Sequence, residues 1–181
     1  MVKGNKLLII FAHPNNESFL ADLKESFIES HLHQKIKEIN LYQEKADFFY
    51  KFHKADKIIK KYQKMIDWAD TLIFFFPCWW FNIPAIMKGF IDVVFEYGWA
   101  FRSENGKTRG LLESKSAYIF TTYGSSFWQV RMKHKDPGLK SLVYGTLSVC
   151  GIKTKKIYRF YQVSSVFNKK RVHWLEKMKK I

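Results

Sequence analysis

Side chains that can bind a small molecule gather in three short segments, of which residues 13–18 are the first. This segment begins with His13 and ends with Ser18, a residue type that caps helices. A helix N-terminus offers free N–H groups and the positive end of a dipole to a phosphate, and His13 can add a proton donor there. The glycine patterns of P-loop and Rossmann sites do not occur in the sequence, which disfavours nucleoside triphosphates and Rossmann-type dinucleotides.

The second segment, Pro77–Phe81, contains three consecutive aromatic residues, Trp79, Trp80 and Phe81. Most aromatic clusters belong to a hydrophobic core, but a loop between two prolines usually lies at the surface. Three large rings there expose costly apolar area unless something covers them. The segment therefore predicts core packing, a slot for a flat aromatic ligand, or contact with a partner subunit.

The elements on either side place this second segment at the edge of a sheet. The apolar run Thr71–Phe76 is typical of a strand that is buried on both faces of a parallel sheet. Pro84 suits the first turn of a helix, and Ile86 and Phe90 follow at helical spacing. The aromatic segment thus follows the carboxyl end of a strand, which is where open α/β sheets bind ligands.

Strands and helices alternate along the rest of the chain. Further strands are predicted over Lys6–Ala12, Lys35–Leu41, Lys115–Thr122 and Lys153–Phe160. Helices are predicted over Ser18–Leu32, Asp56–Trp68, Leu139–Val149 and a last segment capped by Ser164 or Ser165, with Val172, Leu175 and Met178 inward. Residues 42–54 stay unassigned, and residues 96–113 and 123–137 are expected to be irregular. This alternation predicts an α/β fold, a doubly wound five-stranded parallel sheet with flavodoxin-like order 2-1-3-4-5 and helices on both faces.

In that order the first, third and fourth strands are neighbours, so the loops at their carboxyl ends should meet. These loops are residues 13–18, residues 77–81 and the third segment, Thr121–Gly124. We therefore expect one site at one edge of the sheet, within a single domain over residues 1–181.

Composition narrows the class of protein. The 181 residues are 47% hydrophobic, which fits one folded domain. The two cysteines, Cys78 and Cys150, form no Cys/His cluster, so no zinc site or disulfide scaffold is expected, and a reducing cytoplasm is favoured. The first apolar run lacks a cleavage site, and prolines and charges interrupt residues 71–95, so neither a signal peptide nor a membrane span is predicted.

The net charge of +15 is unevenly distributed. Residues 1–101 hold 13 Lys and 12 Asp or Glu, whereas residues 102–181 hold 18 Lys or Arg and 4 Asp or Glu. A basic half can attract nucleic acid, an anionic membrane or a phosphorylated small molecule. Most of these lysines are better explained as a solvated surface, and no nucleic-acid-binding motif is present in the sequence.

Four motifs in order resemble one known family. They are Ala12–Pro14 with Ser18 and Phe19, then Phe76–Gly89 (FPCWWFNIPAIMKG), then Tyr97–Phe101 and finally Thr121–Gly124. Together they resemble the phosphate loop, the FPxxW run, the GxA[FY] segment and the Thr-Thr-Gly-Gly turn of the flavodoxin-like NAD(P)H dehydrogenase (quinone) family. That family includes the quinone reductases and the ancillary oxidoreductases of glutathione-gated potassium efflux systems. The resemblance covers nearly the whole chain.

The resemblance implies a tightly bound flavin, FMN or FAD, in a homodimer whose interface helps to form the site. The flavin-binding residues that it implies are His13, Ser18, Phe19, Leu20 and Ala21 at the phosphate and ribityl end, Pro77, Cys78, Trp79, Trp80 and Phe81 along the isoalloxazine, and Thr121, Thr122, Tyr123 and Gly124 around its pyrimidine edge. FMN is favoured because the chain is short and lacks the extra C-terminal segment of larger FAD members.

Two residues depart from the family pattern, and a third has a loosely matching position. Tyr123 stands where the family usually has Gly, and Trp79 stands where it usually has Gln, so both enlarge the side chain beside the expected flavin. The Tyr123 ring is expected either to narrow the acceptor pocket or to point away from it, in an unusual backbone conformation or a different turn. His134 is the candidate for a substrate-binding histidine, although a solvated loop histidine between Lys133 and Lys135 is the competing interpretation.

The leading functional hypothesis is a two-electron NAD(P)H:quinone oxidoreductase that transfers a hydride from NADPH or NADH through the flavin by a ping-pong mechanism. A flavin-binding regulatory subunit of a potassium efflux transporter and a nitro- or azo-compound reductase remain alternatives. A one-electron flavodoxin-type carrier is disfavoured because such carriers are usually acidic, and this chain is basic.

Overall fold

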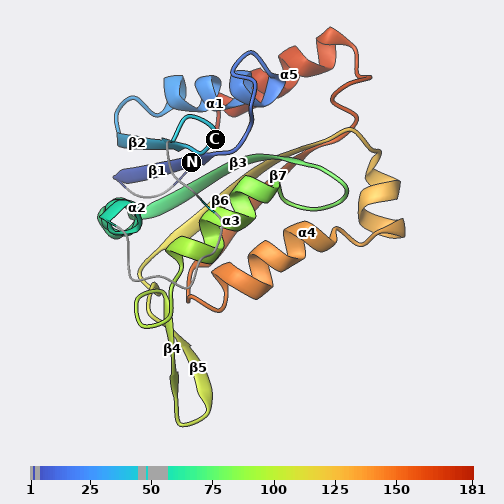
Figure 1. The fold of residues 1–181 in the computed structure, drawn as a ribbon. Coiled ribbons are helices and arrows are strands. Elements are labelled where there is room, and N and C mark those ends of the chain that lie inside the picture. Colours follow the sequence, from blue (N-terminus) through green and yellow to red (C-terminus); the bar gives the residue numbers. More distant parts are fainter. Residues whose placement is uncertain (1, 3–4, 45–47, 49–56) are drawn as a thin grey trace.

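A five-stranded parallel sheet forms the centre of the computed structural model, which describes residues 2, 5–44, 48 and 57–181 (Figure 1). Its strands are β1 (Lys6–Phe11), β2 (Lys35–Asn40), β3 (Thr71–Cys78), β6 (Ser116–Tyr123) and β7 (Lys153–Phe160). They pair in the order β2-β1-β3-β6-β7, with every pair parallel. The predicted fold class and strand order are therefore confirmed.

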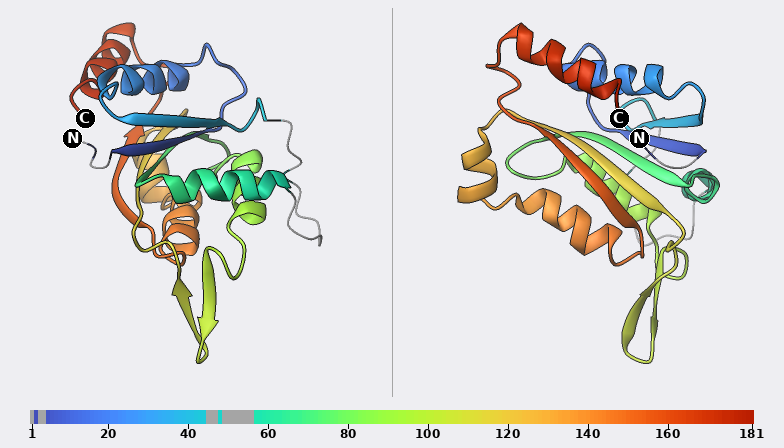
Figure 2. Two further views of the ribbon diagram at one scale, coloured as in Figure 1. Left: turned by 90° about the vertical axis from the view of Figure 1, so that its left-hand side faces the viewer. Right: turned by 180° about the vertical axis from the view of Figure 1, so that it is seen from behind.

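Helices cover both faces of the sheet (Figures 1 and 2). On one face lie α1 (Phe19–Ser30) and α5 (Asn168–Met178), packed on the odd-numbered residues of β1. The even-numbered residues of β1 face α2 (Lys57–Trp68), α3 (Ala85–Val94), α4 (Pro137–Lys140) and the π-helical turn η2 (Ser141–Leu147). Because both faces are covered, side chains of both parities must be apolar, and the strands read as unbroken apolar runs.

The central strand β3 is buried from Thr71 through Pro77 and is longer than predicted by two residues. Its pairing with β1 ends at Phe75, whereas its pairing with β6 continues to Cys78. Pro77 therefore lies beyond its β1 neighbour, where a residue without an N–H group leaves no ladder bond missing on that side. This extension of β3 past β1 brings Cys78 level with Tyr123, the last residue of β6.

The prediction of irregular structure over residues 96–113 was wrong. An antiparallel hairpin, β4 (Phe101–Glu104) and β5 (Lys107–Gly110), projects away from the sheet (Figure 1). Asn105 and Gly106 form its two-residue turn with φ of 51° and 73°. Asn-Gly is the residue pair that a type I′ hairpin turn prefers, because both positions need positive φ. The signal was present in the sequence.

Several predicted boundaries also need correction. Helix α1 ends at Ser30, not Leu32, and α5 follows Phe167 instead of a serine cap. Met178 is buried as expected, but Val172 is 53% exposed. The segment expected to be irregular over residues 123–137 contains a π-helical turn, η1 (Trp128–Lys133). The predicted helix start at residue 56 and most of residues 42–54 lie outside the described residues.

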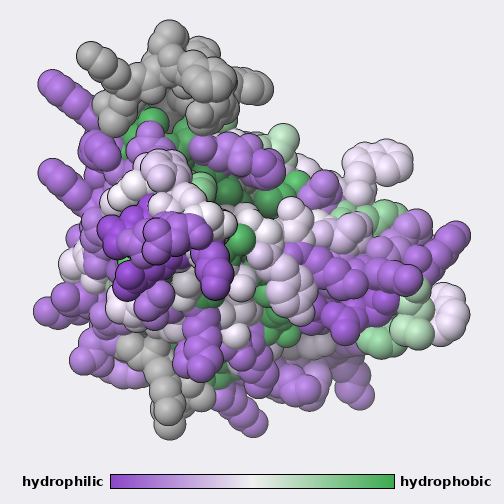
Figure 3. Space-filling view, turned by 90° about the horizontal axis from the view of Figure 1, so that it is seen from below, coloured by the Kyte–Doolittle hydropathy of each residue, from purple (hydrophilic) through white to green (hydrophobic). Residues whose placement is uncertain are grey.

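One face of the molecule shows a mainly hydrophilic surface. Seen from the hairpin side, hydrophilic residues dominate and hydrophobic ones form small areas between them (Figure 3). The described part of the chain contains no helix with the length and apolarity needed to cross a membrane.

Candidate functional site

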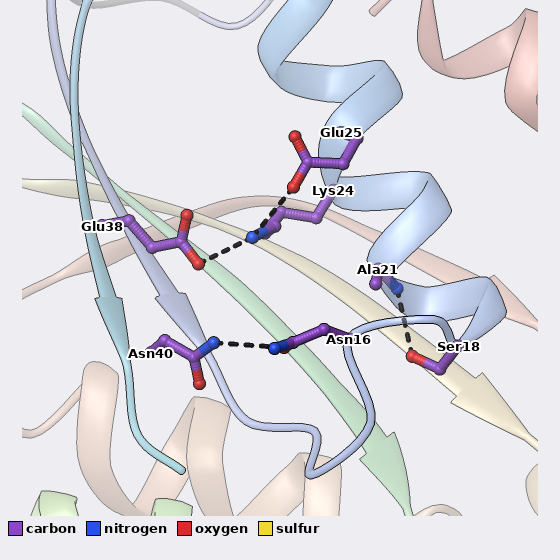
Figure 4. A network of polar contacts seen from close by, with 7 residues as sticks. All are labelled: Asn16, Ser18, Ala21, Lys24, Glu25, Glu38 and Asn40. Carbon is purple, nitrogen blue, oxygen red and sulfur yellow. Dashed lines mark hydrogen bonds and ion pairs between the residues drawn. The ribbon is translucent and has the colours of Figure 1, made fainter. Parts of the chain in front are cut away.

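The first predicted segment ends in a capped helix, as expected. Ser18 is the N-cap of α1, and its Oγ accepts a hydrogen bond from the Ala21 N–H at 3.3 Å (Figure 4). The preceding N–H groups, those of Phe19 and Leu20, belong to the first turn of α1, where helix geometry supplies no acceptor. The side chains of Leu20 and Ala21 are buried. An anion at this end would therefore be held by backbone N–H groups and the helix dipole.

His13 lies between this helix and the second segment. Its Nδ1 is 3.1 Å from the Asn15 N–H, which donates to it when that nitrogen is unprotonated, and its ring lies 6.2 Å from the Trp79 ring. This ring pair links residues 13–18 to the aromatic segment. The structure thus places these two segments next to each other, as the strand order predicts.

The aromatic segment forms a tight and strained turn. Trp79 N–H donates to the Asn82 carbonyl at 3.0 Å, and Asn82 N–H donates back to the Trp79 carbonyl at 2.9 Å. The two residues enclosed by these bonds, Trp80 and Phe81, have left-handed φ values of 51° and 56°. Non-glycine residues in this conformation cost on the order of 1–3 kcal/mol each and gather at functional sites. Trp80 is 96% exposed, so the strain does not serve core packing.

The third segment is extended and buried until it reaches Gly124. Thr121, Thr122 and Tyr123 continue β6, and all three are buried. Tyr123 therefore adopts neither the left-handed backbone nor the outward direction considered from the sequence. Its hydroxyl instead donates to Asp136 Oδ1 at 2.9 Å. Thr121 Oγ1 is buried and has no hydrogen-bond partner among the described residues.

The second and third segments enclose a cavity of about 220 Å³. The residues that line it are Cys78, Trp80, Phe81, Tyr123, Gly124 and Ser125. Five of these six are among the predicted flavin-binding residues, and Ser125 is the addition. Pro77, Trp79 and Thr122 lie next to lining residues in the chain but do not line the cavity, and neither does Thr121. No residue of the first segment lines it, and the His13 ring contacts the ring of Trp79, the neighbour of two lining residues.

His134 lies against the aromatic segment, although its side chain is exposed. Its ring stacks on the Phe81 ring with centroids 3.9 Å apart and planes at 20°. A second contact fixes the same two segments, because the Gly138 N–H donates to the Phe81 carbonyl at 3.0 Å. The structure therefore brings His134 to the rim of the cavity, which the sequence spacing alone left open.

Two residues that the sequence analysis did not select lie behind the cavity wall. Asp136 Oδ1 accepts from Tyr123, and its Oδ2 accepts from Arg159 Nε at 2.9 Å. Burial, and then the Asp136 carboxylate, raise the pKa of Tyr123 and raise that of Cys78 to about 12. No sequence pattern pairs Asp136 with Arg159. The one hint in the sequence was Arg159 itself, a basic residue inside the predicted strand Lys153–Phe160, next to a buried residue.

A larger cavity of about 820 Å³ lies on the other side of α1, at the carboxyl ends of β1 and β2. Lys24 is central to it, with its Nζ 2.7 Å from Glu38 and 3.1 Å from Glu25 (Figure 4). Asn40 Nδ2 donates to Asn16 Oδ1 at 3.4 Å nearby. These contacts tie α1 to β2, and the lining has mixed charge and no aromatic wall.

Metal ligation has little basis in this geometry. Within the residues described, His, Cys, Asp and Glu side chains form no group of three that could hold a metal ion.

Comparison with known proteins agrees with this architecture. Residues 5–181 match the family model described as "Flavodoxin-like fold". The chain is similar to the human ribosyldihydronicotinamide dehydrogenase [quinone], with 31% identity over 182 residues, 83% of this chain and 78% of that protein. It is also similar to an uncharacterized NAD(P)H oxidoreductase of Haemophilus influenzae, 33% identical over 109 residues, a match that spans 60% of this chain but only 54% of that protein.

Among solved structures, Smu.1420 from Streptococcus mutans UA159 superimposes with a TM-score of 0.89 and 29% identity, covering 97% of both chains. The likeness therefore extends over the sheet, both helical layers and the loops at the carboxyl edge.

Proposed function

The chain belongs to the flavodoxin-like NAD(P)H dehydrogenase (quinone) family, as its motifs predict, and on this premise we propose that it passes electrons from NADPH or NADH through a bound flavin to a quinone-like acceptor. The named relatives confirm the predicted enzyme class, an oxidoreductase. The observation that carries the proposal is the aromatic-walled cavity between the loops after β3 and β6. Open α/β sheets bind their ligands at this edge.

The residues at this edge suit a flavin, and FMN in particular. The N-terminus of α1 can hold a phosphate on the free N–H groups of Phe19 and Leu20. Thr121 Oγ1, in the strand that leads to the cavity, is a buried polar atom without a hydrogen-bond partner among the described residues, which is costly unless a ligand atom pairs with it. Trp80 and Phe81 supply flat apolar surface in the cavity itself. Phosphate site, polar edge and aromatic wall correspond to the three chemical parts of FMN.

The roles of the protein residues follow from this arrangement. When bound, the flavin supplies the hydride chemistry, and the protein supplies binding, orientation and electrostatics. The aromatic side chains of Trp80 and Phe81 would contact the flat ring of the flavin and shield it from water. His134, stacked on Phe81, forms the rim that a nicotinamide or quinone ring would pass. One cavity has to serve both rings in turn.

A homodimer is part of the proposal. Trp80, Phe127 and Trp128 are 96%, 56% and 65% exposed; Trp80 lines the cavity, and Phe127 and Trp128 closely follow the lining residue Ser125 in the chain. Rings of this size are seldom left in water by a protein, so a second copy that covers them is expected. Sedimentation should give a dimer. A flavin-loaded monomer at high protein concentration would contradict this part.

Flavin binding tests the proposal directly. The purified protein should be yellow or quench FMN fluorescence at micromolar concentration, and mass analysis of the released cofactor separates FMN from FAD. Phe81→Ala should weaken binding, because it removes a cavity wall. Leu32→Ala, an exposed apolar residue beyond the far end of α1, is the matched control and should bind as wild type does. A wild-type protein that binds neither flavin would refute the proposal.

Kinetics test the shared slot. Initial rates with NADPH or NADH and a benzoquinone should give parallel double-reciprocal lines, as expected when donor and acceptor occupy one cavity in sequence. Intersecting lines would indicate a ternary complex. The basic half of the chain should favour NADPH at low ionic strength, and this preference should weaken as salt screens the extra phosphate.

A further inference from the structure

A buried ion pair lies directly behind the cavity wall. Asp136 and Arg159 are 2.9 Å apart, and their side chains are only 3% and 20% exposed. They come from different elements, Asp136 from the loop before α4 and Arg159 from β7. Tyr123, at the end of β6, donates its hydroxyl to the same carboxylate. Three separate elements thus converge on one buried negative charge and one partly buried positive charge.

This pair is one hydrogen bond away from the cavity. Tyr123 lines the cavity and donates its hydroxyl to Asp136, while Tyr161 stacks on the Tyr123 ring with centroids 5.2 Å apart. Cys78, at the end of the neighbouring strand β3, also lines the cavity. After burial, the Asp136 charge is the second cause that raises the pKa of its thiol. Because little water reaches this region, the two charges act on the cavity with weak screening.

The backbone around Asp136 indicates that its position is held against a cost. Lys135 and Asp136 have left-handed φ values of 59° and 52°. His134, the residue before them, stacks on Phe81, which with Trp80 forms another pair of consecutive non-glycine residues in the left-handed region. Strain of this kind persists only where surrounding contacts impose it. The bonds from Tyr123 and Arg159 are the contacts that hold the Asp136 side chain.

We propose that the Asp136–Arg159 pair sets the relative affinity of the cavity for the oxidised and the reduced flavin, with Tyr123 as the positioning residue that holds the carboxylate. The inference rests on the proposed function. Reduced flavin is the more negative form, so the guanidinium of Arg159 favours it and the carboxylate of Asp136 opposes it. With both present, the balance of the two effects sets the ratio. Loss of one partner exposes the effect of the other.

The sign of each effect separates this role from a structural one. If the pair only fastened loops together, removal of either partner would weaken the binding of both flavin forms alike. An electrostatic role predicts opposite changes in the ratio of the two dissociation constants. For a unit charge about 12 Å from the flavin ring, roughly the span of the intervening Tyr123 side chain and its hydrogen bond, and with an effective dielectric constant of about 20, the ratio should change on the order of tenfold.

The experiment measures the midpoint potential of the flavin free in solution and of the flavin bound to the protein. The difference between the two potentials gives the ratio of the dissociation constants for the oxidised and reduced forms. Asp136→Asn keeps the size of the side chain and should shift the ratio about tenfold toward the reduced form. Arg159→Met should shift it about tenfold toward the oxidised form. Tyr123→Phe changes no charge and should alter the ratio less than either.

Charge-matched controls come from an exposed pair at the far end of α1. Glu29 and Lys179 are 3.7 Å apart with side chains 66% and 59% exposed. Glu29→Gln and Lys179→Met make the same changes in net charge and should leave the ratio unchanged, because solvent screens them.

Each outcome decides one question. Equal or same-direction shifts in Asp136→Asn and Arg159→Met would overturn this inference while leaving flavin binding, and so the proposed function, intact. A wild-type protein that binds no flavin would instead remove the proposed function. Leaving a buried carboxylate unpaired is strongly destabilising, so Arg159→Met is checked for folding by circular dichroism. If it does not fold, Asp136→Asn decides alone, since an unchanged ratio there refutes the inference.

Discussion

Replacing Gly138 with Ala should disturb the cavity through a backbone clash. A Cβ at this position would lie 2.4 Å from Asn82 Cα and 2.8 Å from both Asn82 C and Asn82 Oδ1. Two of these three atoms belong to the backbone, so no side-chain rotation relieves the contact. Asn82 closes the aromatic turn through its two bonds with Trp79, and the turn must therefore move by about 1 Å to restore ordinary van der Waals distances.

The expected magnitude follows from three terms. Overpacking against backbone costs about 1–3 kcal/mol. Moving the turn weakens the bond from Gly138 N–H to the Phe81 carbonyl, which adds about 1 kcal/mol. Gly138 lies in α4, so the gain in helix propensity from alanine offsets about 0.5–1 kcal/mol. The net loss is about 2 kcal/mol, which for a chain of this size lowers the melting temperature by roughly 4–8 °C.

Urea unfolding of the flavin-free protein, followed by circular dichroism, measures the free energy of unfolding, and quenching of FMN fluorescence measures cofactor binding. Gly145→Ala is the matched control, because its Cβ would meet one atom, at 3.9 Å. That variant should be as stable as wild type or slightly more so, and should bind FMN normally. A Gly138→Ala protein with unchanged stability and unchanged FMN affinity would refute the reasoning that this contact shapes the cavity.

Three further predictions concern titratable groups. His31 is buried against Phe27, and burial lowers its pKa. The unfolded chain therefore binds a proton on this histidine at higher pH than the folded protein does, and the free energy of unfolding should fall as the pH drops below about 6.5. His31→Gln should remove this pH dependence, as measured by urea unfolding at pH 7.5 and 5.5. Burial lowers the pKa of Lys24, but the bonds of Lys24 to Glu38 and Glu25 outweigh that effect and raise its pKa overall. Lys24→Met should lower the free energy of unfolding by about 1–3 kcal/mol. An unchanged free energy of unfolding would mean that the Lys24–Glu38 pair is not needed to join α1 to β2. The pKa of Cys78, raised to about 12 by burial and by Asp136, should make its alkylation by iodoacetamide at pH 8 much slower than that of a free thiol, and alkylation at the rate of free cysteine would show that the thiol is not held as described.

Some features of this protein depended only on local sequence. Residues 7–11 are continuously apolar because strands with helices on both faces bury every side chain, and that pattern alone fixed β1. Ser18 starts α1 because its side chain satisfies an N–H group within the same turn. The Asn105–Gly106 turn was equally local, so the hairpin that we expected to be irregular was readable from two residues. The alternation of elements then restricted the sheet to few orders.

The candidate site was predictable in outline for the same reason. Strand order places the loops after β1, β3 and β6 at one edge, and the sequence identified those loops and the family to which they belong. The sequence did not decide which side chains of these loops face the cavity. Tyr123 could point into the slot or away from it until the structure showed its hydroxyl bound to Asp136. Residue type does not determine that choice when both directions are sterically open.

Only the tertiary structure decided the contacts that complete the wall. Asp136 and Arg159 are 23 residues apart and meet because β7 pairs with β6 in a register that brings Arg159 beside Thr121. His134 lies on Phe81 because η1 and Gly138 turn its loop back toward β3. In each contact, the local sequence of one segment does not indicate which residue of the other segment it will meet. Long-range register and loop packing arise from the summed burial of the whole chain, and no local pattern encodes them.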